Sequence, residues 1–116
     1  MARRWRFYET TGGRSPVGAF LRSPDLPPGD RVEIIAAMKD VEQNGLRAAR
    51  HLDGDIYEVR ADGNRVTYRV LFAAEGSKNR ILLALHAFNK KTQATPREVI
   101  SLAKRRLTDW RSRGAN

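Results

Sequence analysis

Cysteine is absent from this chain, and histidine occurs only twice among its 116 residues. The absence of cysteine excludes disulfide bonds, thiolate zinc sites and a cysteine nucleophile. His51 and His86 alone cannot form a convincing metal site, and no acidic residues with the spacing of metal ligands surround them. We therefore expect neither a metal nor a cofactor.

Long hydrophobic runs are absent as well. The longest runs, such as residues 81–85, have the length of a β-strand, whereas a membrane-spanning helix needs about 20 apolar residues. Residues 1–5 are basic but lead into no apolar segment, which argues against a secretory signal. We expect no membrane association and a cytoplasmic location.

Positive charge dominates what is present. The formal net charge is +9 and the sequence pI is near 10.8, with Lys and Arg spread along the whole chain. Any single basic residue is most simply a solvated surface side chain. The total positive charge, however, favours a polyanionic partner such as nucleic acid or a ribosome. The length and the 41% hydrophobic content fit one globular domain over residues 1–116.

The first half of the chain predicts one strand and two helices. Residues 4–9 alternate like a short strand, and Ser15 followed by Pro16 is typical of a helix start, so a short helix is expected over residues 16–22. A proline-rich turn then leads to a longer helix over residues 29–44, which Gly45 ends.

The second half predicts a meander followed by a helix. Strands are expected over residues 56–61, 65–74 and 80–88, and the last of these is apolar on both faces, as in a strand covered on both sides. Thr95 as N-cap, Pro96 in the first position and Glu98 in a capping box predict the final helix. The resulting class is α+β, a twisted antiparallel sheet with N-terminal helices and a C-terminal helix packed on one face.

Strand alternation places Glu58, Arg60 and Arg69 together on the face opposite the apolar side chains. Taken alone, this group is most simply a surface salt bridge, which is worth at most about 1 kcal/mol. The segment that follows the meander, residues 88–96, adds two lysines, hydroxyl and amide groups, and a helix N-terminus. Because helix N-termini attract anions, the combination predicts a phosphate-binding concavity.

Cleavage of RNA at such a site needs a base for the 2′-hydroxyl, cations for the phosphate and an acid for the leaving oxygen. The candidates for proton transfer are Glu58, His86, Lys90 and Lys91, because a lysine among other cations can lose its proton more easily. By simple alternation His86 shares a strand face with Leu82, Ala84 and Phe88. A packed, hydrogen-bonded role for His86 is the first interpretation and catalysis the second.

Three motifs resemble the phage-derived branch of the RelE/HigB toxins, whose members carry L-x-G-x-x-Y-E-[LIV]-R, Y-R-[VLI] and F-x-K-K-T-x-x-[TS]-P in this order. The matching stretches are residues 52–60, 68–70 and 88–96. The resemblance implies a microbial-ribonuclease-like fold and ribosome-dependent, metal-independent cleavage of mRNA. It also implies neutralisation by an antitoxin, often a helix-turn-helix protein.

In related toxins a cationic cluster handles the scissile phosphate, and the resemblance carries this role to Arg60, Arg69, Lys90 and Lys91. Contacts to RNA are expected from Lys90, Lys91, Thr92 and Arg65. Glu58 stands where some relatives have a basic residue. It is therefore either the general base or a residue that orients Arg60.

Two other functions are compatible with this resemblance. ParE-like toxins share the fold and poison DNA gyrase without the basic catalytic cluster, and a basic phage protein could bind the ribosome or nucleic acid without any enzymatic activity. The presence of Arg60, Arg69, Lys90 and Lys91 favours an endoribonuclease.

Overall fold

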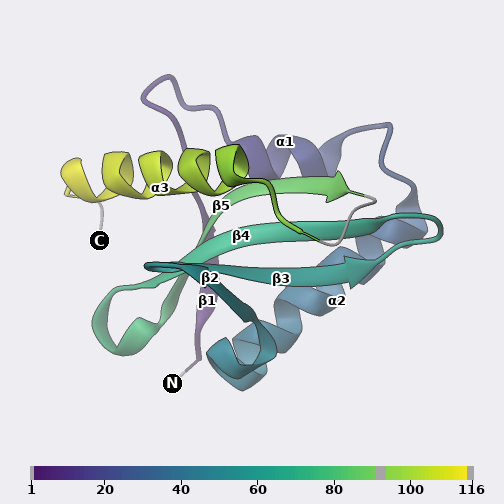
Figure 1. Ribbon diagram of the computed structural model, residues 1–116, viewed down its shortest axis with the longest axis horizontal. Helices are drawn as coiled ribbons and strands as arrows, with labels where there is room; N and C mark the ends of the chain where they lie inside the picture. The colour runs from purple at the N-terminus through teal and green to yellow at the C-terminus, as the bar shows by residue number, and fades with distance from the viewer. Residues whose placement is uncertain (1, 91–93, 115–116) are drawn as a thin grey trace.

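A computed structural model describes residues 2–90 and 94–114, without the side chain of Lys90. Its elements, in chain order, are β1 (Arg4–Phe7), α1 (Pro16–Arg22), α2 (Pro28–Asn44), β2 (Arg50–Asp53), β3 (Ile56–Asp62), β4 (Thr67–Glu75), β5 (Ile81–Lys90) and α3 (Arg97–Ser112) (Figure 1). Short 3-10 turns occupy Gly45–Ala48 and Ser77–Asn79. The predicted α+β class is confirmed.

The five strands form one sheet in the order β1-β5-β4-β3-β2. Neighbours from β2 to β5 are antiparallel, as a meander requires, but β1 pairs parallel with β5. The sheet is therefore mixed and mostly antiparallel. The strand β2 was not predicted, because it is a four-residue edge strand with only one half-buried side chain and hence little hydrophobic pattern.

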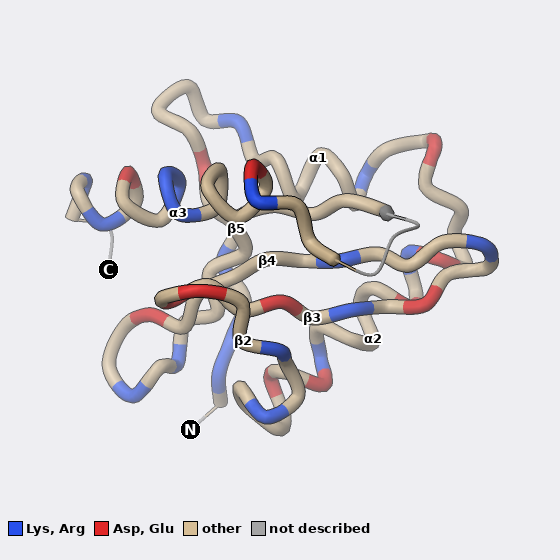
Figure 2. The backbone as a smooth tube through the Cα atoms, viewed as in Figure 1, with Lys and Arg blue, Asp and Glu red and all other residues tan. Residues whose placement is uncertain are grey.

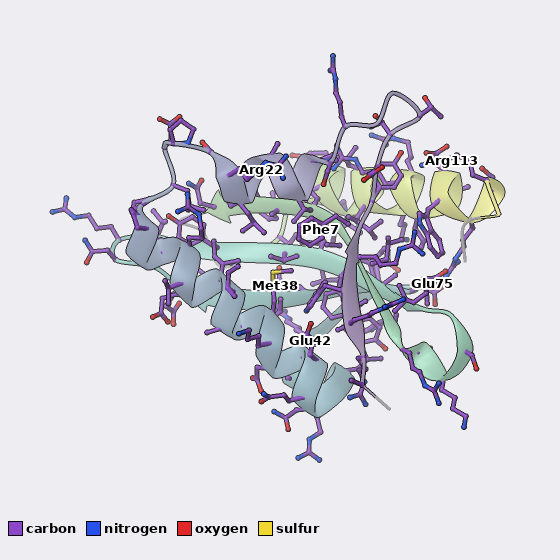
Figure 3. All side chains as sticks on the ribbon, turned by 180° about the vertical axis from the view of Figure 1, so that it is seen from behind. Phe7, Arg22, Met38, Glu42, Glu75 and Arg113 are labelled. Atoms are coloured by element: carbon purple, nitrogen blue, oxygen red, sulfur yellow. The ribbon has the colours of Figure 1, made fainter. Side chains whose placement is uncertain are left out.

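Helices cover both faces of the sheet, and the prediction of helices on a single face was wrong. The helices α1 and α2 lie on one face, and α3 packs on the other (Figure 1). Figure 3 views the molecule from the side of α2, with Met38 directed at the sheet. The physical reason is that β4 and β5 bury side chains on both faces, so each face needs its own apolar cover.

Two separate core clusters follow from this arrangement. The cluster on the α3 face contains the buried residues Tyr8, Ile56, Leu71, Ala73, Leu83, Leu85, Ala103, Leu107 and Trp110. The buried residues Ala103, Leu107 and Trp110 form the apolar face of α3 that covers this side of the sheet. No helix in the described ranges is both long and apolar enough to span a bilayer.

The helix starts agree with the sequence at α1 and differ at α3. The Ser15 hydroxyl accepts the Gly18 N–H at 3.1 Å, and Pro16 opens α1 as predicted. In α3 the N-cap is Pro96, and no side chain makes a capping hydrogen bond. The expected capping box of Thr95 is wrong because its hydroxyl is used elsewhere.

Candidate functional site

Three charged side chains and one hydroxyl meet where the middle of the sheet passes under the start of α3. We call Glu58, Arg60, Arg69 and Thr95 the arginine–glutamate cluster. The Cα atoms of Arg60 and Arg69 are directly opposite each other in the β3–β4 ladder, and Glu58 lies two residues earlier on the same face. Figure 2 shows basic segments on β3 and β4 close to the chain that leads into α3.

Glu58 is the centre of this cluster and is only 1% exposed. Its Oε2 accepts the Nε–H of Arg60 at 3.0 Å, and its Oε1 lies 3.8 Å from Nη1 of Arg69. The Thr95 hydroxyl donates to the same Oε1. A carboxylate this deeply buried is stable as an anion only because cations and donors surround it.

Arg69 is the buried cation of the cluster, at 2% exposure. Its Nη1 donates to the Thr95 oxygen at 2.9 Å. Burial lowers the pKa of the Arg69 guanidinium, the charge of Glu58 opposes that effect, and the charges of Arg60 and Arg50 add to it. Arg69 therefore lies within a crowded positive field that Glu58 partly neutralises.

Arg60 is the charged side chain of the cluster that reaches solvent. Its side chain is 34% exposed, against 2% for Arg69 and 0% for Glu58. An anion that approaches this face meets Arg60 first, with Glu58 and Arg69 behind it. The geometry thus separates an exposed cation, Arg60, from the buried carboxylate that holds it.

Arg50 is a further cation that the sequence analysis missed. It is exposed on β2, and its Cα atom lies opposite Glu58. A signal was available, because Asp53, Gly54 and Asp55 read as a turn between two short strands. Pairing residues 50–53 with the strand that carries Glu58 would have placed Arg50 beside the cluster.

Thr95 attaches the start of α3 to the sheet. Its hydroxyl accepts from Arg69 and donates to Glu58, so one side chain joins the loop to both buried charges. The first N–H groups of α3, which lack a side-chain cap, and the positive end of the helix dipole lie just beyond it. This arrangement suits a phosphate near the cluster.

His86 lies on the α3 face of the sheet but apart from the cluster. A β-bulge near Leu85 shifts the register, so that His86 of β5 pairs with Leu71 of β4. On the other side of β4, Leu71 pairs with Glu58 of β3. Two strand spacings, about 10 Å, therefore separate His86 from Glu58. Simple alternation placed His86 with Leu82 and Ala84, and the bulge overturns that placement.

The ring of His86 is held by Arg106 of α3. The Nη1 of Arg106 donates to Nδ1 at 3.1 Å and to the Leu85 carbonyl at 2.7 Å, and the ring stacks on Phe88. Burial lowers the pKa of His86, and the charge of Arg106 lowers it further. His86 is thus favoured in its neutral form with Nδ1 already occupied.

The remaining predicted residues are only partly placed. Lys91 and Thr92 lie outside the described residues, as does the side chain of Lys90, whose backbone ends β5 opposite Thr67. Arg65 is exposed in the β3–β4 turn, beyond the paired ends of the two strands. Of the four cations expected to handle phosphate, the described part of the structure brings together Arg60 and Arg69.

Within the described residues, no three His, Asp or Glu side chains are placed to hold a metal ion.

Comparison with known proteins agrees with the motifs. No curated protein matches the chain. The phage-derived Gp49-like family (DUF891) matches residues 23–108, well over half of the sequence, and the match covers α2, β2 to β5 and most of α3. The chain belongs to the Gp49-like family of phage-derived proteins, which is part of the RelE/HigB toxin superfamily, and many RelE-like toxins are ribonucleases.

Proposed function

We propose that this protein is the toxin of a toxin–antitoxin pair and an endoribonuclease that cuts mRNA on the ribosome. Cleavage proceeds by attack of the 2′-hydroxyl on the adjacent phosphorus, with release of the 5′-oxygen. Family membership supports the class of protein, and the net charge of +9 supports a polyanionic target. The arginine–glutamate cluster supports the chemistry.

The observation that carries the proposal is the position of Arg60. Glu58 fixes its guanidinium by accepting a hydrogen bond from Nε, while a third of the Arg60 side chain stays exposed. The same carboxylate accepts from Thr95, just before α3. A guanidinium held in this way can donate to a phosphate whose negative charge grows in the transition state. A pre-oriented donor is more effective than a mobile one because it need not reorganise during the reaction.

Glu58 serves as a positioning residue in this proposal. Its carboxylate is fully buried and already accepts from Arg60 and Thr95, whereas a general base must come within hydrogen-bonding distance of the 2′-hydroxyl. Between the two roles left open by the sequence, orientation of Arg60 therefore fits the geometry better. Replacement of Glu58 by Gln should weaken cleavage by loosening Arg60 rather than by removing a base.

Proton transfer is assigned to Lys90 or Lys91. Of the other predicted candidates, Glu58 is buried and His86 has Nδ1 occupied by Arg106. A lysine close to several guanidinium groups releases its proton more readily than a lysine in water. The cognate partner is proposed to be an antitoxin of the helix-turn-helix type, and the substrate is mRNA bound to the ribosome.

Pulse expression followed by primer extension on a cellular mRNA tests this proposal. The wild type should produce cuts in register with the reading frame, and Arg60→Ala should remove them at equal protein level. Arg47→Ala, which changes an exposed arginine outside the cluster, is the matched control and should keep them. Intact mRNA with a DNA-damage response would instead identify a gyrase poison, and tolerated expression with neither effect would identify a non-enzymatic binder; both results contradict the proposal.

A further inference from the structure

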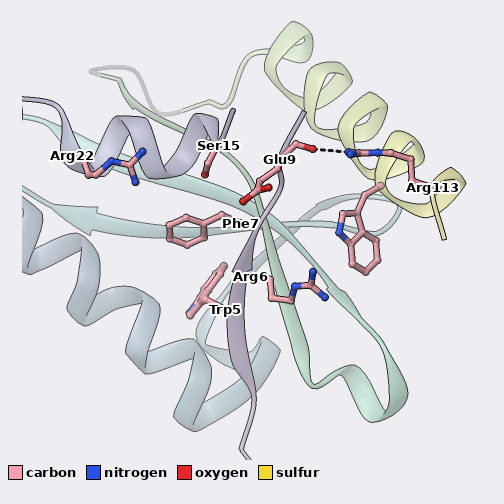
Figure 4. Close-up of a pocket in the computed structure, with 8 residues that line it drawn as sticks. Trp5, Arg6, Phe7, Glu9, Ser15, Arg22 and Arg113 are labelled. Atoms are coloured by element: carbon pink, nitrogen blue, oxygen red, sulfur yellow. Dashed lines mark hydrogen bonds between the residues drawn. The ribbon is translucent and has the colours of Figure 1, made fainter. Parts of the chain in front are cut away.

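A groove of about 530 Å³ runs along the outer edge of β1. This edge of the sheet is the one opposite β2, away from the arginine–glutamate cluster on β3 and β4. Figure 4 shows β1 passing through it, with α1 along one wall and the end of α3 along the other. The lining residues are Trp5, Arg6, Phe7, Glu9, Ser15, Arg22, Trp110 and Arg113. We call this region the β1 groove.

The backbone of β1 offers an open strand edge in this groove. β1 is the first strand in the sheet order, and in the described ranges it pairs only with β5. The N–H groups of Arg4 and Tyr8 both donate to carbonyls in or just before β5, each at 2.9 Å. Because N–H groups alternate sides along a strand, those of Trp5 and Phe7 point away from β5 and into the groove. An edge of this kind can accept another strand.

The charge of the groove selects an acidic occupant. Arg6 and Arg22 are exposed on opposite walls, and among the described residues neither makes an ion pair or a hydrogen bond. Arg113 already donates to Asp109 and to the Glu9 carbonyl, at 2.8 and 2.6 Å. Three arginines against one lining carboxylate leave the groove positive, with two guanidinium groups available to carboxylates from outside.

Aromatic side chains make the walls rigid. The indole of Trp5 donates to the Met38 carbonyl at 2.8 Å and packs edge-on against Phe72, with ring centroids 5.0 Å apart. On the other wall Trp110 is buried, and the guanidinium of Arg6 lies 5.9 Å from its ring centroid. A groove with such fixed walls needs little reorganisation to accept a ligand.

We propose that the β1 groove binds an extended, acidic segment of a partner protein, which adds to the sheet beside β1. Its backbone would pair with the outward groups of Trp5 and Phe7, and its carboxylates would reach Arg6 and Arg22. Successive side chains of a strand point to opposite faces, so neighbouring acidic residues can reach the two walls. The proposal is independent of the nuclease activity proposed above.

Tryptophan fluorescence tests this directly, because both tryptophans of the chain line the groove. The probe is a synthetic peptide of glutamate, threonine and valine, titrated into the full-length protein. It should change the emission saturably and slow amide hydrogen exchange at Trp5 and Phe7. A peptide with every second amide N-methylated should bind far more weakly, and so should one with lysine in place of glutamate.

Charge reversal supplies the second arm of the test. Arg6→Glu and Arg22→Glu should each raise the dissociation constant of the acidic peptide by about tenfold or more. The matched control, Arg47→Glu, carries the same charge change away from the groove and should leave binding near the wild-type value. A peptide that leaves tryptophan emission unchanged would overturn the proposal. It would also be overturned if a single-stranded RNA oligonucleotide, and not the peptide, gave the Arg6- and Arg22-dependent change.

Discussion

Arg60 and Arg69 lie opposite each other on neighbouring strands, yet burial gives them different roles. Arg69 is enclosed with Glu58, so its guanidinium compensates a buried carboxylate. Arg60 shares the same carboxylate but keeps a third of its side chain in solvent. The first arginine is expected to matter for stability and the second for contact with an anion.

Alanine substitutions should separate these roles. Arg69→Ala leaves Glu58 without its buried cation and should lower the free energy of unfolding by about 3–5 kcal/mol. Arg60→Ala should lower it by about 1 kcal/mol or less, because a partly exposed ion pair contributes little. Its effect on cleavage should be large, about a hundredfold or more. Urea unfolding and the rate of cleavage, measured on both variants, check this; equal unfolding curves for the two variants would refute it.

His86 should make stability depend on pH. Its folded-state pKa is lowered below the ordinary 6.5, first by burial and then by Arg106. The folded state therefore binds fewer protons than the unfolded chain, so the contribution is complete above pH 6.5 and is lost as pH falls towards the folded-state pKa. His86→Gln should flatten the fall in stability as the pH drops below 6.5. Urea unfolding of the wild type and of His86→Gln at several pH values checks this, and equally steep falls would contradict it.

At the scale of whole elements, the start of α3 is fixed by Thr95 rather than by a helix cap. Thr95→Val keeps the shape of the side chain but removes the hydroxyl that joins Arg69 and Glu58. We expect a loss of about 1–3 kcal/mol in unfolding free energy, since buried charged partners are left unsatisfied. Cleavage should fall as well, and Thr95→Ser should restore both. If Thr95→Val unfolds and cleaves like the wild type, the link between α3 and the cluster has no role.

Much of the element order could be predicted from local signals. The helix ends are examples, because they depend on single residues: Ser15 and Pro16 start α1, and Gly45, at φ 76°, ends α2. These helices begin or end within about one residue of the prediction. The features that were missed depend on tertiary contacts. The bulge at Leu85 and the engagement of Thr95 by Arg69 arise only when β4, β5 and α3 are already packed.

The candidate site was predictable to a similar extent. Alternation correctly placed Glu58, Arg60 and Arg69 on one face, because a strand's side chains alternate whatever packs on it. Their burial was not predictable, since it depends on α3 covering that face. Arg50 was missed because β2 is short and largely exposed.

At the scale of the whole molecule, the two proposed binding regions occupy different parts of one sheet. The arginine–glutamate cluster lies on β3 and β4 with Arg50 on the edge strand β2, and the β1 groove lies along the opposite edge. A partner in the groove would therefore leave Arg60 exposed. Substrate contact and partner binding can then be altered separately by mutation.

Cleavage of a defined mRNA by the purified protein on programmed ribosomes tests the central claim most directly. The wild type and Arg47→Ala should release a fragment cut in frame that ends in a 2′,3′-cyclic phosphate, the product of 2′-hydroxyl attack. Arg60→Ala should release about a hundredfold less. An intact mRNA with the wild-type protein, or equal cleavage by Arg60→Ala, would contradict the account.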